Sequence, residues 1–203
     1  MSKEVIILGT SGHGKVVLDI VQRCGDRVLG FLDDNPLGET FMGLPVLGGC
    51  GDYRRWPEAQ FVIAIGSAAV REKLSRSMEG VRWYTAIHPD AVVSQLDTSI
   101  GEGSVVMANA VVNAGARIGR HCIMNTGSVV EHDNRIGDFV HISVGANLAG
   151  TVRVGDHTWV GIGAVISNNL TVCADCMLGA GAVVVRDITE AGTYVGVPAQ
   201  KIK

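Results

Sequence analysis

The sequence predicts two parts of different architecture: a small α/β domain with a parallel sheet over residues 1–87 and a parallel β-helix over residues 88–203. The β-helix is indicated by an aliphatic residue at every sixth position from Ile100 to Val184. The α/β domain is indicated by apolar runs that alternate with helical stretches before that point. Composition favours strands and tight turns, because glycine accounts for 27 of 203 residues and aromatic residues for only 5%.

The first 87 residues alternate between strand and helix patterns. Strands are expected at 5–8, 28–32, 61–65 and 81–87, and helices at 15–23 and 68–78. Such alternation is typical of a parallel sheet covered by helices. The proline of His88-Pro89 interrupts the pattern and marks the expected boundary between the two parts.

The six-residue period cannot stay on one face of a helix, but it suits a strand that bends at regular intervals. A small residue often stands four places after each aliphatic one, as at Ala110 and Ala164, and both would point inward. Two residues in each hexapeptide remain to turn a corner. Three hexapeptides therefore close a triangular coil of 18 residues, and successive coils stack about 4.8 Å apart.

Charge and cysteine content limit the classes of partner. The net charge is −3 without a basic block, which argues against nucleic acid. The apolar run near the N-terminus is too short for a signal-peptide core or a membrane span, so we expect a cytoplasmic protein without a membrane partner. The five cysteines are irregularly spaced, and Cys173-x-x-Cys176 lacks a second pair, so we expect reduced thiols and no metal.

The segment Gly9–Gly14 follows a strand and opens a helix, so its amides form a candidate anion site. Asp33 and Asp34 end the next strand about 20 residues later, where Rossmann-like folds hold a carboxylate that accepts from a ribose or a base. The spacing is not the strict G-x-G-x-x-G, and a glycine turn with solvated carboxylates is the alternative. A whole nicotinamide dinucleotide is not expected, because residues 1–87 provide little more than one mononucleotide-binding half.

The whole chain resembles bacterial sugar acetyltransferases with a left-handed β-helix, a family that includes UDP-4-amino-sugar N-acetyltransferases of the bacillosamine pathway and sialic acid O-acetyltransferases. The resemblance is carried by the segments at 9–14, 31–34, 64–66, 125–132, 137–141 and 195–199. It implies a left-handed coil and acetyl-CoA as the co-substrate. It also implies contacts with a nucleotide sugar at Ser11, Gly12, His13, Asp33, Asp34 and Gly66.

His132 is the candidate base among six histidines, because it lies at a predicted corner between Glu131 and Asp133. A neighbouring carboxylate favours the imidazolium and fixes the tautomer. The resemblance also makes the histidine of this segment the base, with Asp133 where the family has a glutamate. Gly150 follows 18 residues later, directly above His132 in the next coil, so its amide is a candidate oxyanion donor.

The resemblance further implies contacts with coenzyme A at His141, Ile162 and Ala180, where the family has glycine at the last position. Asn125 is expected on the same edge as His141, one coil below, and completes the candidate cofactor site. Coil arithmetic puts His132 half a turn from His141, on the opposite side of the coil. If both serve one reaction, the active site must lie between two chains.

The expected function is acetyl-CoA-dependent N-acetylation of the 4-amino group of a UDP-linked 2-acetamido-4-amino-trideoxy sugar. Alternatives in the same class are O-acetylation of sialic acid and N-acetylation of GDP-perosamine. A non-catalytic nucleotide-binding scaffold is an alternative from another class, but it would not explain a histidine between two acidic residues. A metalloenzyme resembling γ-carbonic anhydrase is a further alternative, but it would not explain the nucleotide-type domain. We expect a homotrimer packed through apolar edges near Val140 and Trp159.

Overall fold

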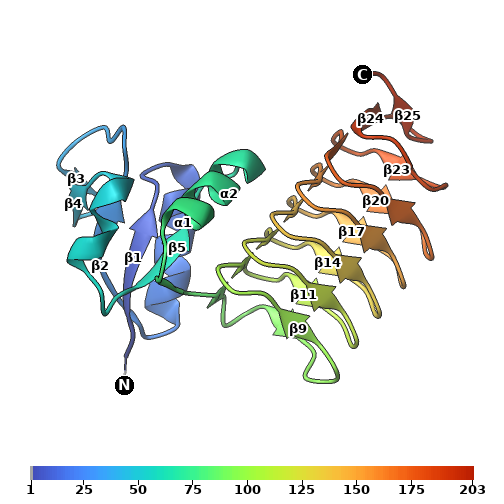
Figure 1. Ribbon diagram of the computed structural model, residues 1–203. Coiled ribbons are helices and arrows are strands. Elements are labelled where there is room, and N and C mark those ends of the chain that lie inside the picture. The colour runs from blue at the N-terminus through green and yellow to red at the C-terminus, as the bar shows by residue number, and fades with distance from the viewer. Residues whose placement is uncertain (1) are drawn as a thin grey trace.

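The structure is a computed structural model that describes residues 2–203 as an α/β domain beside a stack of triangular coils (Figure 1). The α/β domain contains a six-stranded sheet in the order β3-β4-β2-β1-β5-β6, parallel except for the β3–β4 pair. Its elements are β1 (Glu4–Leu8), α1 (Gly12–Arg23), β2 (Arg27–Leu32), β3 (Thr40–Phe41), β4 (Leu44–Gly48), the 3-10 helix η1 (Cys50–Arg55), β5 (Gln60–Ile63), α2 (Ala68–Ser77) and β6 (Arg82–Trp83).

Three local features of this domain differ from the sequence-based expectation. Helix α1 starts at Gly12, so the end of the predicted glycine turn belongs to its first helical turn. The β3–β4 hairpin and η1 were not predicted. The segment 81–87 forms two strands instead of one, because the backbone leaves the first sheet after β6 and joins the coil at β7 (Ala86–Ile87).

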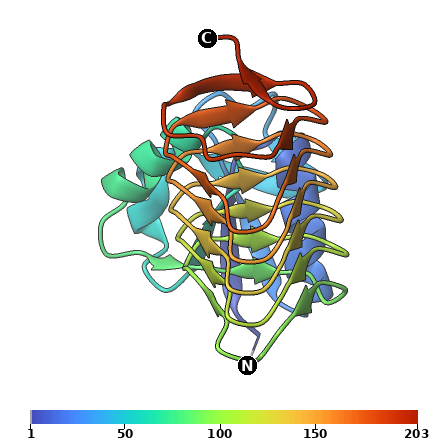
Figure 2. The ribbon, with the colours of Figure 1, turned by 90° about the vertical axis from the view of Figure 1, so that its right-hand side faces the viewer.

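Most strands of the coil pair in parallel 18 residues apart, as in Val105 with Ile123, and build three flat faces (Figure 2). The spacing is 19 residues at the start of the coil, as in Ala86 with Val105, and the last two strands of the chain pair antiparallel. The domain face, which the α/β domain covers in part, holds β7, β10 (Val105–Val106), β13 (Ile123–Met124), β16 (His141–Ile142), β19 (Trp159–Val160), β22 (Cys176–Leu178), β24 (Gly192–Val195) and β25 (Gln200–Lys201). The valine face holds β8 (Val92–Val93), β11 (Val111–Val112), β14 (Val129–Val130), β17 (Asn147–Leu148), β20 (Val165–Ile166) and β23 (Val183–Val184). The arginine face holds β9 (Ser99–Ile100), β12 (Arg117–Ile118), β15 (Arg135–Ile136), β18 (Arg153–Val154) and β21 (Thr171–Val172).

The interior of the coil confirms the predicted period. The aliphatic residue of each hexapeptide from Val106 to Val184 is buried and packs into one continuous core. The small residues that precede these aliphatic ones by two positions also point inward. Val140 occupies such an inward position and is fully buried, so the prediction that it forms an exposed apolar edge was wrong. Trp159 is 37% exposed, as a residue of an outward column can be.

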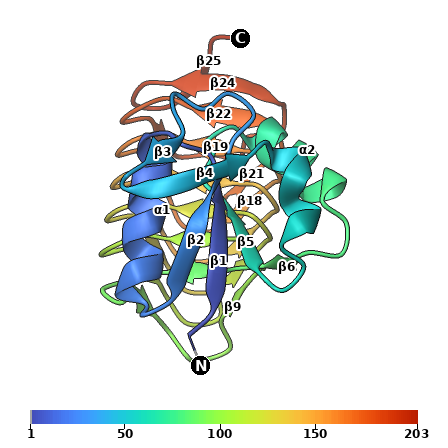
Figure 3. The same cartoon turned by 90° about the vertical axis from the view of Figure 1, so that its left-hand side faces the viewer.

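The α/β domain lies in front of the domain face in Figure 3, and its core packs on the early strands of that face. Val105, Met107 and Ile123 from the coil share a core cluster with side chains of β1 and α1. At the corner between the arginine and domain faces, a column of rings continues from the α/β domain into the coil. It consists of Trp83, His121, Phe139 and His157, with centroid separations of 4.7, 5.4 and 5.5 Å. Within residues 2–203, no helix is long and apolar enough to cross a membrane.

Corner residues provide a direct test of the coil geometry. Thr151 adopts φ +62°, a left-handed conformation that is unfavourable for a β-branched residue. Replacing it by glycine should raise the free energy of unfolding by about 1 kcal/mol. Thr171→Gly is the matched control, because exposed Thr171 lies in strand β21 and glycine should lower stability there. Chemical denaturation measures both, and equal signs for the two variants would contradict the assigned corner.

The buried histidines predict a pH dependence of stability. Burial, with the charges of Arg120 and Arg71, lowers the pKa of His121 from 6.5 to about 4. Between these two values the unfolded chain binds more protons than the native one, so stability is complete above pH 6.5 and declines as the pH falls toward 4. His121→Asn should flatten that decline in thermal unfolding curves. Phe139→Leu removes the same ring stack without a titrating group, and it should lower stability while leaving the slope intact.

Candidate functional site

The predicted nucleotide-binding residues lie at the carboxyl ends of adjacent parallel strands. The loop after β1 contains Ser11, the loop after β2 contains Asp33 and Asp34, and the loop after β5 contains Gly66. Strands β2 and β5 flank β1 on opposite sides, so these loops border the point at which the strand order reverses. Open α/β sheets bind ligands at such a point. Glycine is required at position 14, because a Cβ there would collide with the Gly9 carbonyl oxygen.

The Asp33 carboxylate hydrogen-bonds the loop after β1. Its Oδ2 accepts from the Thr10 amide at 2.7 Å and from the Thr10 hydroxyl at 2.5 Å, and its Oδ1 accepts from the Asn35 amide at 2.9 Å. Burial opposes ionisation, but these hydrogen bonds outweigh it and lower the pKa of Asp33. Asp34 accepts from the Cys50 amide through Oδ1 at 2.7 Å, and both aspartates line a cavity of about 580 Å³ next to the β3–β4 hairpin.

His141 lies on the domain face, and its tautomer follows from Asn125. The Thr126 amide donates to Asn125 Oδ1 at 2.8 Å, so Asn125 Nδ2 faces His141 Nε2 at 3.1 Å and donates to it. The proton of the neutral ring is therefore on Nδ1, which is buried and has no partner among residues 2–203. Burial, then Arg71 and then His13, lower the pKa of His141 to about 3.

His13, in the first turn of α1, acts on this part of the coil. Burial and the Arg71 guanidinium lower its pKa to about 4, so its imidazole is neutral at pH 7. Its Nε2 is buried without a partner in the described chain. The structure thus brings His13, His141 and Asn125 to the same contact between the α/β domain and the coil.

Trp159 and Arg71 belong to this region and were not among the predicted site residues. The Trp159 ring stacks on His141 at 4.8 Å, and its Nε1 donates to Ser143 Oγ at 2.6 Å. It lines a cavity of about 640 Å³ with Ser67, at the N-terminus of α2. The repeat places Trp159 on the outside of the coil, and this position was a sequence signal for the site. Arg71 gave no such signal, because it lies in a helix rich in charged residues.

His132 occupies the corner between the valine and arginine faces, away from His141. Its Nδ1 lies 2.9 Å from Asp133 Oδ2, and its backbone amide donates to Glu131 Oε2 at 3.2 Å. Asp133, not Glu131, is therefore the carboxylate that contacts the ring. Gly150 lies against the other ring nitrogen, because a Cβ there would be 2.5 Å from His132 Nε2.

The predicted residues form three groups in one chain. The first is the nucleotide loop region with His13, His141 and Asn125. The second consists of Ile162 and Ala180, which are exposed on the corner between the domain and valine faces. The third is His132 with Gly150 on the next corner. One chain does not bring all three groups together.

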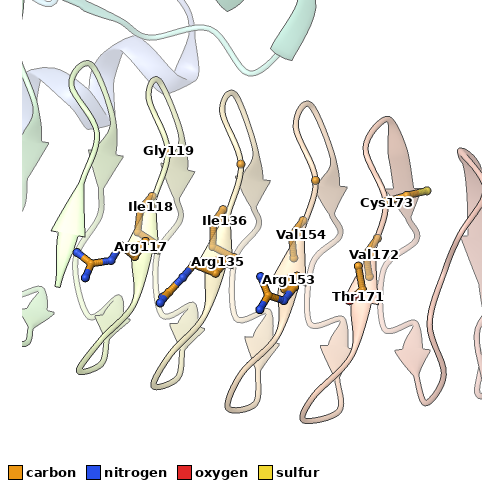
Figure 4. A pocket seen from close by; sticks show the side chains of 12 residues that line it. Arg117, Ile118, Gly119, Arg135, Ile136, Arg153, Val154, Thr171, Val172 and Cys173 are labelled. Carbon is orange, nitrogen blue, oxygen red and sulfur yellow. The ribbon is translucent and has the colours of Figure 1, made fainter. Parts of the chain in front are cut away.

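A further groove of about 450 Å³ runs along the arginine face (Figure 4). Arg117, Arg135 and Arg153 stand in one column along it, and none of the predicted site residues lines it. Among residues 2–203, no group of three or more histidine, cysteine or acidic side chains is arranged to hold a metal ion.

Residues 4–78 match the family described as PglD N-terminal domain, and residues 97–132 match the bacterial transferase hexapeptide family. The chain is 40% identical over 113 residues to the UDP-N-acetylbacillosamine N-acetyltransferase of Bacillus subtilis, a stretch that spans 52% of each protein. It is 30% identical over 119 residues to an uncharacterized mimivirus protein, of which the match spans only 24%. The chain thus spans about half or less of the curated relatives it matches.

Solved structures match over nearly the full chain. The acetyltransferase domain of PglB from Neisseria gonorrhoeae, in complex with acetyl coenzyme A, is 37% identical with a TM-score of 0.94 and complete coverage of both chains. PerB from Caulobacter crescentus, in complex with CoA and GDP-perosamine, is 38% identical with a TM-score of 0.93 and coverage of 98% and 97%. The chain therefore belongs to the bacterial sugar acetyltransferase family that joins a PglD-type N-terminal domain to a left-handed β-helix of hexapeptide repeats.

Proposed function

We propose that the protein transfers an acetyl group from acetyl-CoA to the 4-amino group of a UDP-linked 2-acetamido-4-amino-trideoxy sugar. The observation that carries the proposal is that His13, whose Nε2 is buried at the start of α1 in the candidate nucleotide site, meets His141 of the coil at the contact between the two domains. The acceptor class is supported by the name of the Bacillus relative, and the acetyl donor by the neighbours solved with acetyl-CoA or CoA. GDP-perosamine in the Caulobacter structure makes a GDP-linked amino sugar the closest alternative.

The nucleotide is read by the loops after β1, β2 and β5. The amides of Ser11, Gly12 and His13 at the start of α1 suit the diphosphate, and Gly66 leaves open space where a side chain would stand. Because both oxygens of Asp33 hold Thr10 and Asn35, recognition of the base falls mainly to Asp34. Asp34 Oδ2 makes no hydrogen bond within residues 2–203, so it is free to accept from a base N–H.

His132 acts as the general base. Its Nδ1–H donates to Asp133, which leaves the lone pair of Nε2 to take a proton from the attacking amine. The amine nitrogen forms a bond to the thioester carbon, the carbon–sulfur bond breaks, and the coenzyme leaves as a thiolate that recovers the proton from the imidazolium. The Gly150 N–H donates no hydrogen bond among residues 2–203 and lies beside Nε2, so it is available to the oxyanion.

The three faces of the coil point to a homotrimer. The α/β domain covers the domain face, and the arginine face carries a charged column. The valine face is uncovered, and its outward column consists of Val92, Val111, Val129, Asn147, Val165 and Val183. A face with valine at five of its six outward positions favours contact with further copies of the chain.

The same packing completes the site. If three chains turn their valine faces toward a common axis, the two corners that bound each face meet the opposite corners of the neighbouring chains. The His132 corner of one chain then lies against the Ile162 and Ala180 corner of the next. Coenzyme A contacts at His141, Ile162 and Ala180 would thereby face a base supplied by another subunit.

A transfer assay tests the proposed function. Acetyl-CoA is combined with UDP-, GDP- and dTDP-linked 4-amino sugars and with sialic acid, and the product is identified by mass spectrometry. His132→Ala should lower kcat by roughly 100-fold or more with little change in the KM for acetyl-CoA. Asp133→Asn should lower kcat by less than His132→Ala does, because it removes the carboxylate that holds the His132 ring but leaves the imidazole in place. An inactive wild type on every acceptor would favour the binding scaffold.

Mixed trimers test the shared site. His132→Ala and His141→Ala chains, each nearly inactive alone, are refolded together. One interface of a mixed trimer can then hold both intact histidines, so part of the activity should return. A refolded mixture of wild-type chains and chains with both substitutions is the control, because its activity shows how mixing with inactive subunits affects the assay. If mass spectrometry shows mixed trimers but activity stays at the level of the single variants, the site is not shared across the interface.

A further inference from the structure

Arg71, in the first turn of α2, is the largest fully buried side chain within residues 2–203 and is 1% exposed. It forms no ion pair in this part of the chain, although a buried charge is usually paired with an opposite one. Burial lowers its pKa only to about 10, so the guanidinium stays charged at pH 7. Carbonyl oxygens must therefore supply the compensation.

The four carbonyls that accept from Arg71 belong to two different domains. Nη1 donates to Ile65 O at 3.2 Å and to Gly66 O at 2.6 Å, both in the loop after β5. Nε donates to His121 O at 2.9 Å, and Nη2 donates to Phe139 O. His121 and Phe139 occupy the same corner in successive coils, so the guanidinium spans the loop and two turns of the β-helix.

We propose that Arg71 is a positioning residue of the acetyl transfer. Its guanidinium fixes the Gly66 loop, which follows β5 and contains Gly66 of the nucleotide site, in one position relative to the coil. The inference rests on the proposed function, in which Gly66 contacts the nucleotide sugar and the coil supplies the coenzyme contacts. Four of the five N–H donors of Arg71 are engaged by these carbonyls, so we assign Arg71 to positioning and not to direct contact with a ligand.

Directional contacts matter here because much of the interface is apolar. On α2, Glu72 adds a polar contact, with its Oε2 3.1 Å from His157 Nε2. Val105, Met107 and Ile123 bury area against the α/β domain, but such contacts tolerate small sliding movements. The planar guanidinium has a rigid fork of donors, and four acceptors from two domains fit it in only one arrangement. A displacement of about 1 Å between reacting groups is enough to reduce a rate by roughly 100-fold.

The charge of Arg71 also acts on the imidazoles on both sides of the contact. It contributes, after burial, to the low pKa values of His13 and His141. The loop and the coil therefore meet through neutral rings, and no charge repulsion between the two histidines pushes the domains apart. This effect accompanies the positioning and follows from the same buried cation.

Kinetics of Arg71→Met and Arg71→Lys test the proposal. Arg71→Met should lower kcat/KM for the nucleotide amino sugar by about tenfold or more, while the KM for acetyl-CoA stays within twofold. Arg71→Lys should fall between it and the wild type, because one ammonium cannot reach all four carbonyls. Arg76→Met is the matched control, since Arg76 is exposed on the same helix and pairs only with Glu72.

Amide hydrogen exchange provides a readout that does not need activity. Loss of the guanidinium should speed exchange in residues 64–68 and around 121 and 139, with strands β1 and β13 unchanged. If Arg71→Met folds and keeps wild-type exchange and acceptor kinetics, the proposal is overturned, and a rise spread evenly over both domains also overturns it. Arg71→Lys carries the same test if Arg71→Met does not fold.

The exchange measurement also separates this inference from the function on which it rests. If the wild type acetylates no nucleotide amino sugar, the proposed function fails. The local change in exchange then still decides whether Arg71 fixes the Gly66 loop to the coil, and its absence would overturn the inference independently.

Discussion

The 18-residue register of the coil is the constraint on which the rest of the molecule depends. Parallel pairing at this spacing turns each position of a hexapeptide into a straight column, so aliphatic residues stack inside and the outward residues form columns of their own. A slip of one residue would exchange inward and outward side chains along the whole affected strand. The placement of His132 beside Gly150, and of Asn125 beside His141, follows directly from this register.

Each face of the coil consequently presents its own outward column, with mostly valines on one face and three arginines on another. The α/β domain can cover the domain face because Val105 and Ile123 present a flat apolar column to it. Above that contact the same column continues as His141 and Trp159, which form one wall of the candidate site. His132, the proposed base, lies on a different corner, so the proposed mechanism requires two neighbouring surfaces and therefore an oligomer.

Features that repeat were predictable from the sequence, and features that depend on contact between the domains were not. The period from Ile100 to Val184 led to the coil, its core and the relative positions of the histidines. It did not reveal Arg71, because an arginine among charged helical residues has the pattern of a solvated surface. Val140 lies two positions before Ile142 in the repeat, which is an inward position, and it is therefore buried instead of exposed. The division of segment 81–87 depends on the crossing from one sheet to another, which local apolarity does not encode.

In the proposed function, the residues that carry out the transfer lie on the coil, whereas the residues that recognise the acceptor lie on the α/β domain. In the proposed mechanism, the coil columns set the distances among the base, the oxyanion donor and the coenzyme contacts. The loops after β2 and the β3–β4 hairpin lie outside the coil and border the cavity beside Asp34. Structures solved with acetyl coenzyme A or with CoA and GDP-perosamine share this frame at TM-scores of 0.94 and 0.93. In the proposed function, changes in these loops alter the nucleotide that is bound, while Arg71 keeps the loop after β5 in register with the coil.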